Sequence, residues 1–203
     1  VYCAATKRDQ AKIVFNEAKR MVQSTPGLSR RIQALVANLN VAESDSKLEP
    51  LGADADSTDG LNPHGVVIDE LHAHKSAALV DVLQSASGAR SQPMRFEITT
   101  AGHDRTSVCR KHHEYSVRIL EGSAVDDSWF GFIAGVDEGD DYTDPRTWAK
   151  ANLNLGVSVY PQYLALECKR AQEIPSEQNT FRRLHLNQWT EQSERWLDVA
   201  AWD

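Results

Sequence analysis

The sequence is poor in cysteine, and its few cysteines lie far apart. Cys3, Cys109 and Cys168 are odd in number and form no Cys-x-x-Cys pair. Disulfide frameworks use even sets of cysteines, and structural zinc sites use closely spaced pairs. The sequence therefore predicts neither a disulfide framework nor a zinc knuckle, and it fits a reducing cytoplasm.

Long apolar runs and a leader segment are also lacking. A membrane-spanning helix needs about 20 consecutive apolar residues, and no run in this sequence approaches that length. The first residues, VYCAATKRDQ, lack the charged and apolar regions of a signal peptide. We expect a soluble protein with no membrane partner. Because the sequence opens abruptly on a strand pattern, we also expect it to be part of a longer polypeptide.

An excess of positive charge is lacking as well. The 203 residues carry a formal net charge of −7. A protein that grips nucleic acid or an anionic membrane with its whole surface is basic. The net charge therefore excludes binding of nucleic acid or an anionic membrane by the whole surface. A local basic patch stays possible. The length suits one domain, or one domain with a small appendage.

The sequence does contain an alternation of strand and helix patterns. Short β-branched or alternating apolar runs predict strands, and apolar residues at helical spacing predict helices. The predicted strands are Val1–Ala4, Gly65–Ile68, Met94–Ile98 and SWFGFIAGVD at 128–137. The predicted helices run from Thr6 as N-cap to about Ser24, through RRIQALVANL at 30–39, from Ser76 to Gly88, and from Asp104 as N-cap to Gly122.

The last third of the sequence has a different character. The segments YPQYLALECKRAQEIP and SEQNTFRRLHLNQWTE predict helices without a strand partner. Strands that alternate with helices are typical of a parallel α/β sheet. We therefore predict an α/β fold with a mostly parallel sheet flanked by helices at residues 1–145, followed by a small helical subdomain at residues 146–203.

One predicted strand ends in two adjacent carboxylates, Asp69 and Glu70, within NPHGVVIDELHAHKS. In an open parallel sheet, ligands bind beyond the carboxyl ends of the strands. Nucleotide hydrolysis needs two carboxylates there: one holds hydrated Mg²⁺, and the other orients or deprotonates the attacking water. The alternative is that a buried strand simply passes into a polar loop.

Two threonines, Thr99 and Thr100, follow the next predicted strand in FEITTAG. In the NTPases that insert an additional strand beside the phosphate-binding one, a polar residue at this tip contacts the γ-phosphate or the attacking water. The alternative is that threonine is simply a good strand residue before a turn.

A phosphate-binding loop is missing from the sequence. No Gly-x-x-x-x-Gly-Lys-Ser/Thr occurs in the 203 residues. In such an NTPase, the strand and loop that wrap the phosphates would then lie upstream of Val1. This absence counts against a nucleotide site in the sequence as given. A fold of the P-loop NTPase, additional-strand type is therefore predicted only as one that lacks its first βα unit.

Several segments, in order, resemble the large terminase subunit of tailed double-stranded-DNA bacteriophages. They are YCAATKRDQA, DGLNPHGVVIDELHAHKS, FEITTAGHD, GFIAGVDEGDDYTDPRTWAKANLNLG and QNTFRRLHLNQWTE. The resemblance covers nearly the whole chain. The family implies a packaging motor in which an ATPase domain threads DNA into a procapsid and an RNase H-like nuclease cuts it.

The resemblance also implies roles for individual residues. It makes Asp69 the Walker B residue that binds Mg²⁺ and Glu70 the catalytic carboxylate. It places Thr99 and Thr100 in the coupling motif, which links hydrolysis to movement, with Thr99 near the nucleotide and Thr100 acting in catalysis.

Three further residues, the cofactors and the partners follow from the resemblance. Thr6, Arg8 and Gln10 match a segment that lies near the nucleotide in these motors. The implied substrate is ATP with Mg²⁺. The implied partners are double-stranded DNA, the portal protein, the small terminase subunit and further copies of the same chain in a motor ring, all in the cytoplasm of the bacterial host of a phage or prophage.

The chain differs from a whole terminase large subunit in two respects. The Walker A segment is expected before Val1, and the nuclease domain is expected to begin after Asp203. We therefore expect the chain alone to be inactive and to bind Mg·ATP negligibly. Two alternatives stay open: another additional-strand NTPase, such as a helicase-like translocase, and a non-catalytic prophage remnant that acts by protein interaction.

Loss of the phosphate-loop strand would leave backbone N–H and C=O groups of its neighbours without partners. We therefore expect either a gap in the sheet beside RFEITT, or direct pairing of that strand with WFGFIAG at 129–135.

Some polar and aromatic groups are assigned structural roles. His72 and His74 are interpreted as residues that open the next helix and not as metal ligands. The acidic segment at 137–144 lacks the glycine and glutamate spacing of a calcium loop and is interpreted as a solvated turn. Trp129, Phe130 and Phe132 are predicted to lie in the core.

The arginine pairs Arg30–Arg31 and Arg182–Arg183 leave three roles open. They are contacts with DNA phosphate, an arginine finger acting in trans, and ordinary helix-surface charge.

Overall fold

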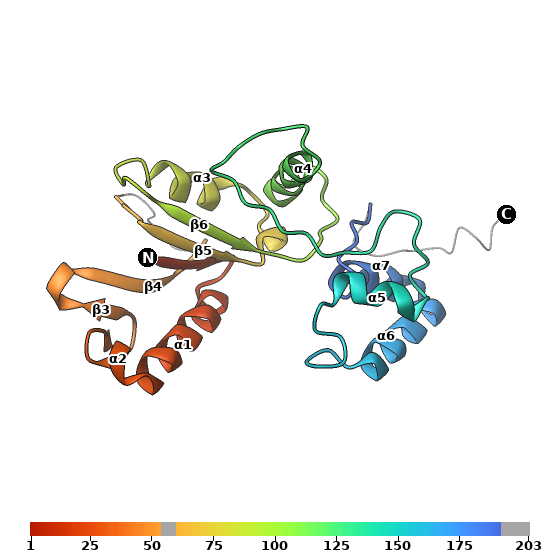
Figure 1. The fold of residues 1–203 in the computed structure, drawn as a ribbon, viewed down its shortest axis with the longest axis horizontal. Helices are drawn as coiled ribbons and strands as arrows, with labels where there is room; N and C mark the ends of the chain where they lie inside the picture. The colour runs from red at the N-terminus through yellow and green to blue at the C-terminus, as the bar shows by residue number, and fades with distance from the viewer. Residues whose placement is uncertain (54–59, 192–203) are drawn as a thin grey trace. The chain divides into compact units, whose positions relative to one another are not determined.

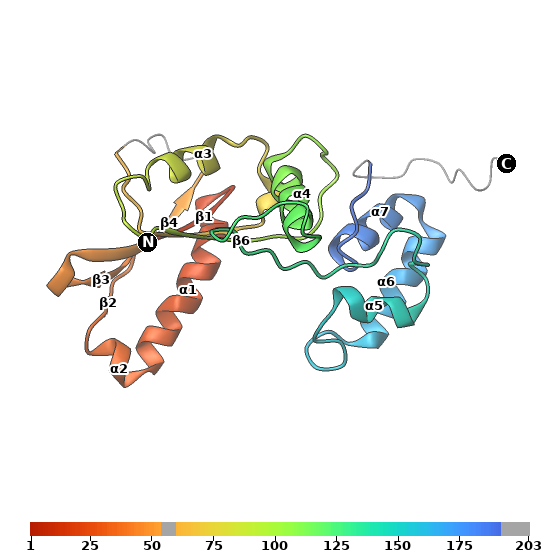
Figure 2. The ribbon, with the colours of Figure 1, turned by 45° about the horizontal axis from the view of Figure 1, so that its top comes forward.

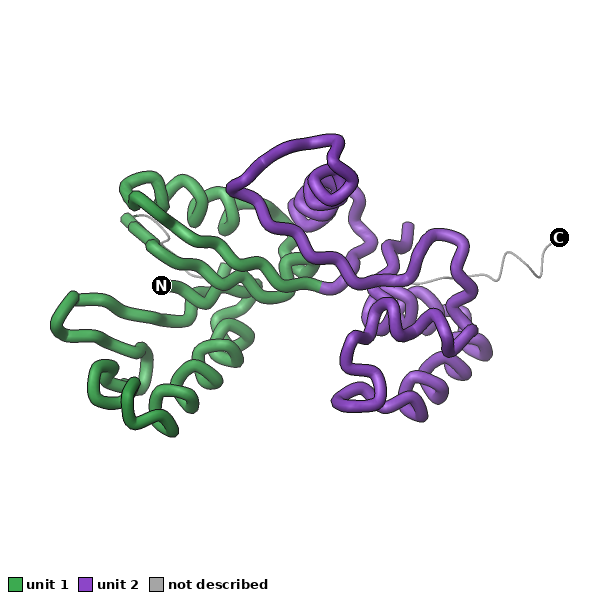
Figure 3. The backbone as a smooth tube through the Cα atoms, viewed as in Figure 1, with its two compact units in different colours: residues 1–99 green, residues 100–203 purple. Residues whose placement is uncertain are grey.

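The computed structural model describes residues 1–53 and 60–191. The chain divides into two compact units, residues 1–99 and residues 100–203 (Figure 3). Part of the predicted helical subdomain, residues 192–203, lies outside the described residues.

The first unit is built on a six-stranded sheet with the order β2-β3-β4-β1-β5-β6 (Figure 1). Strands β4, β1, β5 and β6 run parallel to one another, and β2 and β3 form an antiparallel extension beside β4. The strands are β1 Tyr2–Ala5, β2 Gln33–Ala34, β3 Leu39–Val41, β4 Ser46–Gly52, β5 Gly65–Asp69 and β6 Met94–Ile98. The predicted α/β class with a mostly parallel sheet is confirmed.

Helices cover both faces of this sheet. Figure 2 shows α1 (Arg8–Ser24) and α3 (Ala78–Ser85) on opposite sides of it, and the short α2 (Pro26–Ser29) follows α1. Because β1 lies between two helix layers, all four of its residues are buried. On the α1 side the core is a cluster of Cys3, Phe15, Val22 and Leu39.

The helix predicted at residues 30–39 is wrong. The chain instead forms the hairpin β2–β3, in which Gln33 pairs with Asn40. Leu39 is buried in the cluster with Phe15 of α1. Burial of this side chain outweighs the local helix propensity of the segment, because propensity is a weak preference beside tertiary packing.

The strand predicted at residues 128–137 is also wrong, because that segment has no strand. Its backbone approaches α4 (Val108–Leu120) so closely that a Cβ at Gly131 would lie 2.8 Å from the Cβ of Ser116. The Nε1 of Trp129 donates to the Oγ of Ser116 at 3.0 Å. Packing against α4 replaces pairing in a sheet.

The core role predicted for the aromatic residues of this segment holds only in part. Phe130 is 86% exposed and Phe132 is 68% exposed, so their assignment to the core is wrong. Trp129 is half-buried and packs edge-on against Tyr115. Because the segment packs against α4 on one side only, the side chains of Phe130 and Phe132 are left in solvent.

Strand β6 is the last strand of the described sheet. Within residues 1–53 and 60–191, no strand pairs with its outer side. Of the two arrangements expected from the sequence, the open edge beside RFEITT is therefore the one observed, and pairing with residues 129–135 does not occur.

The second unit contains α4 and a group of three further helices, α5 Pro145–Ala151, α6 Pro161–Glu173 and α7 Pro175–Leu184. Each of these three begins with proline in its first turn, where a missing N–H costs no hydrogen bond. Their shared core consists of Val136, Trp148, Leu164, Cys168, Ala171, Phe181 and Leu186. Helix α4 is capped by Ser107, and not by Asp104 as predicted.

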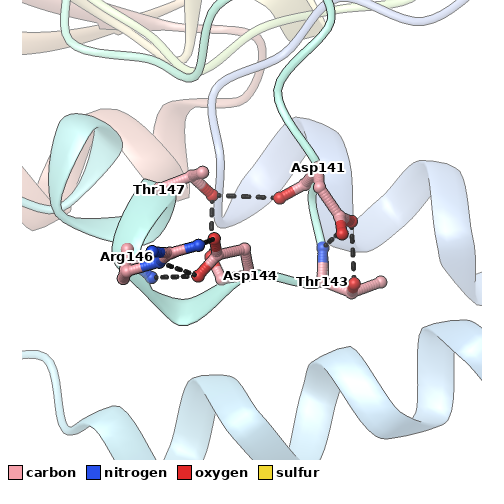
Figure 4. Close-up of polar contacts among 5 residues, drawn as sticks. All are labelled: Asp141, Thr143, Asp144, Arg146 and Thr147. Atoms are coloured by element: carbon pink, nitrogen blue, oxygen red, sulfur yellow. Dashed lines mark hydrogen bonds and ion pairs between the residues drawn. The ribbon is translucent and has the colours of Figure 1, made fainter.

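The acidic segment before α5 is a turn closed by its own carboxylates (Figure 4). Asp144 caps α5 by accepting the backbone N–H of Arg146 at 2.9 Å, and its carboxylate pairs with the guanidinium of the same arginine at 2.6 Å. Asp141 accepts from the backbone N–H and hydroxyl of Thr143. The Thr147 hydroxyl donates to the carbonyl oxygens of Asp141 and Asp144. Elsewhere in the segment, Asp137 and Asp140 pair with Lys150 at 2.5 and 2.8 Å.

The packing of α6 generates a prediction that compares two leucines of one helix. Leu164 is 0% exposed, whereas Leu166 is 49% exposed. Leu164→Ala removes a buried side chain and should lower the free energy of opening α6 and α7 by about 2–5 kcal/mol. Leu166→Ala, the matched control, should change it by less than about 0.5 kcal/mol. Hydrogen exchange of peptides from α6 and α7 measures both, and equal effects would contradict the packing.

Candidate functional site

The carboxyl ends of three neighbouring parallel strands meet at one edge of the sheet. In the register of the sheet, Ala4 of β1 lies beside Ile68 of β5, and Asp69 of β5 lies beside Ile98 of β6. The residues that follow these positions therefore reach the same edge. This is the edge at which open parallel sheets bind ligands, and it carries Thr6, Asp69 and Thr99.

The two carboxylates lie on a sharp turn at the end of β5. Asp69 is the last residue of the strand, and Glu70 adopts a left-handed conformation with φ 54° and ψ 50°. The backbone N–H of Glu70 donates to Oδ1 of Asp69 at 3.0 Å. A non-glycine residue in this region costs about 1–2 kcal/mol, and such residues are concentrated at functional sites. Both residues are half-buried.

A short 3₁₀ helix, η2 (Leu71–Ala73), begins directly after this turn. Leu71 is buried and anchors it. The prediction that His72 and His74 open the next helix is wrong, because α3 begins only at Ala78. Both histidines instead belong to the carboxylate turn and its continuation.

His72 connects the carboxylate turn to the end of β6. Its backbone N–H donates to the Oγ1 of Thr99 at 3.0 Å. Its ring Nδ1 lies 3.1 Å from the same Oγ1 and 3.0 Å from Oε2 of Glu70. Sequence analysis missed this residue as part of the site. The signal in the sequence was the histidine two residues after the Asp-Glu pair, with Thr99 at the tip of the next strand.

His74 lies beneath the same turn. It is 5% exposed. Burial lowers the pKa of His74, and a hydrogen bond to the backbone of Asp69 opposes this shift. The buried imidazole therefore contacts the backbone at the end of β5.

Thr6 and Gln10 lie in contact at the end of β1. The Thr6 hydroxyl donates to Oε1 of Gln10 at 2.6 Å. Thr6 is not the helix cap that the sequence predicted, because α1 begins at Arg8 and Lys7 occupies the N-cap position. The N-terminus of this 17-residue helix points its backbone N–H groups toward the edge, where an anion is favoured. Arg8 is exposed at that terminus.

Thr100 begins the second unit, directly after Thr99. Its side chain is half-buried. The catalytic role expected for Thr100 stays a prediction, as do the roles of Thr6, Arg8, Gln10 and Thr99.

The donor set of this edge suits one kind of metal ion. Among the described residues, no group of three or more His, Cys, Asp or Glu side chains is arranged to hold a metal. Mg²⁺ does not require such a group, because it keeps several waters and binds through one or two carboxylates plus substrate phosphates. The single carboxylate of Asp69 at this edge of the sheet fits that pattern.

The two arginine pairs differ in their surroundings. Arg182 donates from Nε to Oε1 of Gln188 at 2.7 Å and lies over the ring of Tyr142. Burial lowers the pKa of Arg183. Arg30, by contrast, is exposed and donates to the backbone carbonyl of Pro26. The pair on α7 is thus built into its unit, and the choice among DNA contact, arginine finger and surface charge stays open.

Two family models match consecutive parts of the chain. The model of the terminase large subunit, ATPase domain, matches residues 1–118. The model of the terminase large subunit, endonuclease domain, matches residues 123–203. From the resemblance we expected the nuclease domain to begin after Asp203. The match to the endonuclease-domain model instead begins at residue 123. The expected limits at 145 and 146 stay a prediction.

Two individual proteins are similar to this chain. The Escherichia coli K12 protein YmfN is 40% identical over 144 residues, which are 71% of this chain and 32% of that protein. The terminase large subunit of Enterobacteria phage HK97 is 24% identical over 207 residues, which are 100% of this chain and 40% of that protein. The chain therefore spans less than half the length of either relative.

A solved structure shares the fold. The crystal structure of the HK97 bacteriophage large terminase aligns with a TM-score of 0.81 and 25% identity, over 93% of this chain and 39% of that chain. The fold is of the P-loop NTPase type. Among the described residues, no helix has the length and apolar character needed to cross a membrane. The chain belongs to the terminase large subunit family.

Proposed function

We propose that this chain contains the Walker B and coupling part of an ATPase that drives double-stranded DNA into a procapsid, within the segment that matches the ATPase-domain model. The observation that carries this proposal is the carboxylate turn of Asp69 and Glu70, linked through His72 to Thr99 at the end of the neighbouring parallel strand. Family membership supports the reaction class. The HK97 relative is a terminase large subunit.

The two carboxylates have separate tasks in this proposal. Asp69, at the end of β5, would hold hydrated Mg²⁺, which neutralises charge on the transferring phosphoryl group when it is bound. Glu70 would accept a hydrogen bond from the attacking water and take its proton. The left-handed turn at Glu70 keeps the two side chains from competing for one position.

The remaining site residues would sense and hold the nucleotide. Thr99 and Thr100 would report the γ-phosphate to the DNA-moving part of the motor. Thr6, Arg8 and Gln10, at the N-terminus of α1, would lie near the nucleotide. We propose the portal protein, the small terminase subunit and further copies of the chain as partners, in the cytoplasm of the bacterial host.

The chain by itself lacks most of the positive potential of such a site. Its sequence contains no Gly-x-x-x-x-Gly-Lys-Ser/Thr loop, which supplies the backbone N–H groups and the lysine for the β- and γ-phosphates. The negative charges of Asp69 and Glu70 then face an anionic ligand with only the N-terminus of α1 and Arg8 to offset them. We propose that the chain is catalytic only within a longer large subunit.

The first prediction of this proposal concerns the chain as it stands. Calorimetric titration of residues 1–203 with Mg·ATP should give no dissociation constant below about 1 mM, because the carboxylate pair repels the phosphates when no phosphate-binding loop lies beside it. A dissociation constant in the micromolar range would contradict the account of the site. ADP serves as the comparison ligand, since it lacks the γ-phosphate.

The second prediction concerns Glu70 in the complete large subunit. Glu70→Gln keeps the shape of the side chain and removes the base, so it should lower ATP turnover at least about 10²-fold while ATP binding is nearly unchanged. Glu43→Gln, the same change at an exposed site, is the matched control. Turnover retained in Glu70→Gln would refute the catalytic role.

The third prediction concerns coupling through Thr100. Thr100→Val keeps the branched shape and removes the hydroxyl, so the complete large subunit should move less DNA per ATP hydrolysed. Thr25→Val controls for the loss of a threonine hydroxyl at an exposed position. If DNA moves at the wild-type rate per ATP in Thr100→Val, Thr100 is merely a strand-end residue.

A further inference from the structure

His72 contacts both the carboxylate turn and the end of β6. We propose that His72 is a positioning residue that ties the carboxylate of Glu70 to Thr99, so that the position of the base follows the position of β6. This inference rests on the proposed catalytic role of Glu70 and adds a residue to which the motifs above give no role.

The contact with Glu70 favours one tautomer of His72. A carboxylate can only accept a hydrogen bond, and Oε2 of Glu70 lies 3.0 Å from Nδ1 of His72. An unprotonated Nδ1 would place two lone pairs against each other at that distance. In this contact a neutral His72 is therefore expected to carry its hydrogen on Nδ1, whereas a free neutral imidazole favours hydrogen on Nε2.

Thr99 and Glu70 share this one donor. Nδ1 of His72 is 3.1 Å from Oγ1 of Thr99 and carries a single hydrogen. The Thr99 hydroxyl also accepts the backbone N–H of His72 at 3.0 Å, so the threonine stays at the turn even when the ring hydrogen is given to Glu70. If Thr99 moved toward a ligand, the Nδ1 hydrogen of His72 would be shared differently between Thr99 and Glu70. The position of the Glu70 carboxylate would then change.

Glu70 needs such a partner because its side chain is otherwise weakly held. The side chain is 42% exposed, while that of His72 is only 18% exposed and thus better fixed by its surroundings. A hydrogen bond to an ionised acceptor is stronger than a neutral one. The buried Leu71 holds the 3₁₀ turn and with it the distance between the two residues. A fixed base matters because misplacement by about 1 Å can cost up to about 10²-fold in rate.

The contact itself can be tested on residues 1–203 without any ATPase assay. Histidine labelled with ¹⁵N reports its tautomer in long-range proton–nitrogen spectra, recorded at pH 8, where an ordinary imidazole is neutral. We expect His72 in the Nδ1–H form, with the exposed His64 as internal reference in the Nε2–H form. Glu70→Ala should return His72 toward Nε2–H. Wild-type His72 in the Nε2–H form would overturn the inference.

The consequence for catalysis is tested in the complete large subunit. His72→Phe keeps a ring without a donor and should lower kcat about tenfold with KM for ATP unchanged. His72→Asn, whose amide takes the place of Nδ1, should recover most of the loss, and His64→Phe should have no effect. A purely structural role predicts that Asn and Phe behave alike, and that result would also overturn the inference.

These experiments distinguish failure of the positioning role of His72 from failure of the proposed function on which it rests. If Glu70→Gln abolishes turnover and His72→Phe does not lower it, the positioning role alone fails. If Glu70→Gln retains turnover, the proposed function fails, while the tautomer of His72 still shows whether the contact exists. The wild-type spectrum needs no variant, so a misfolded His72→Phe protein leaves the test intact.

Discussion

The in-register parallel pairing of β1, β5 and β6 is the constraint on which the candidate site depends. Parallel neighbours end at the same edge of a sheet, so Thr6, Asp69 and Thr99 meet there although they are far apart in the sequence. Strand β1 lies between β4 and β5 with all four of its residues buried, and this burial specifies its register. A slip of one residue between β5 and β6 would turn the side chains to opposite faces and separate Thr99 from the carboxylate turn.

The sheet places the strand ends, and a short local structure then places the side chains. The left-handed residue Glu70 reverses the chain at the end of β5, and η2 begins at once, with Leu71 buried as its anchor. His72 follows and reaches both Glu70 and Thr99. Three consecutive residues thus link the two strands that, in our proposal, carry hydrolysis and its coupling to movement.

The sequence was sufficient for the elements whose patterns are strong and local. The strands near residues 1–4, 65–68 and 94–98 and the helix ending at Ser24 are where the patterns predicted. The hairpin near Leu39 was not predictable, because burial against α1 outweighed local preference. Nor was the path of residues 128–137, which depends on the close approach of Gly131 to Ser116. The contacts of His72 depend on a 3₁₀ turn that helical spacing does not anticipate.

A crystal structure of the complete large subunit with Mg²⁺ and a non-hydrolysable ATP analogue tests the central claim most directly. The account predicts the metal beside the carboxylate of Asp69, directly or through a bound water, and the γ-phosphate facing Glu70 at the ends of β1, β5 and β6. A nucleotide bound elsewhere, with Asp69 and Glu70 left facing solvent, would contradict it.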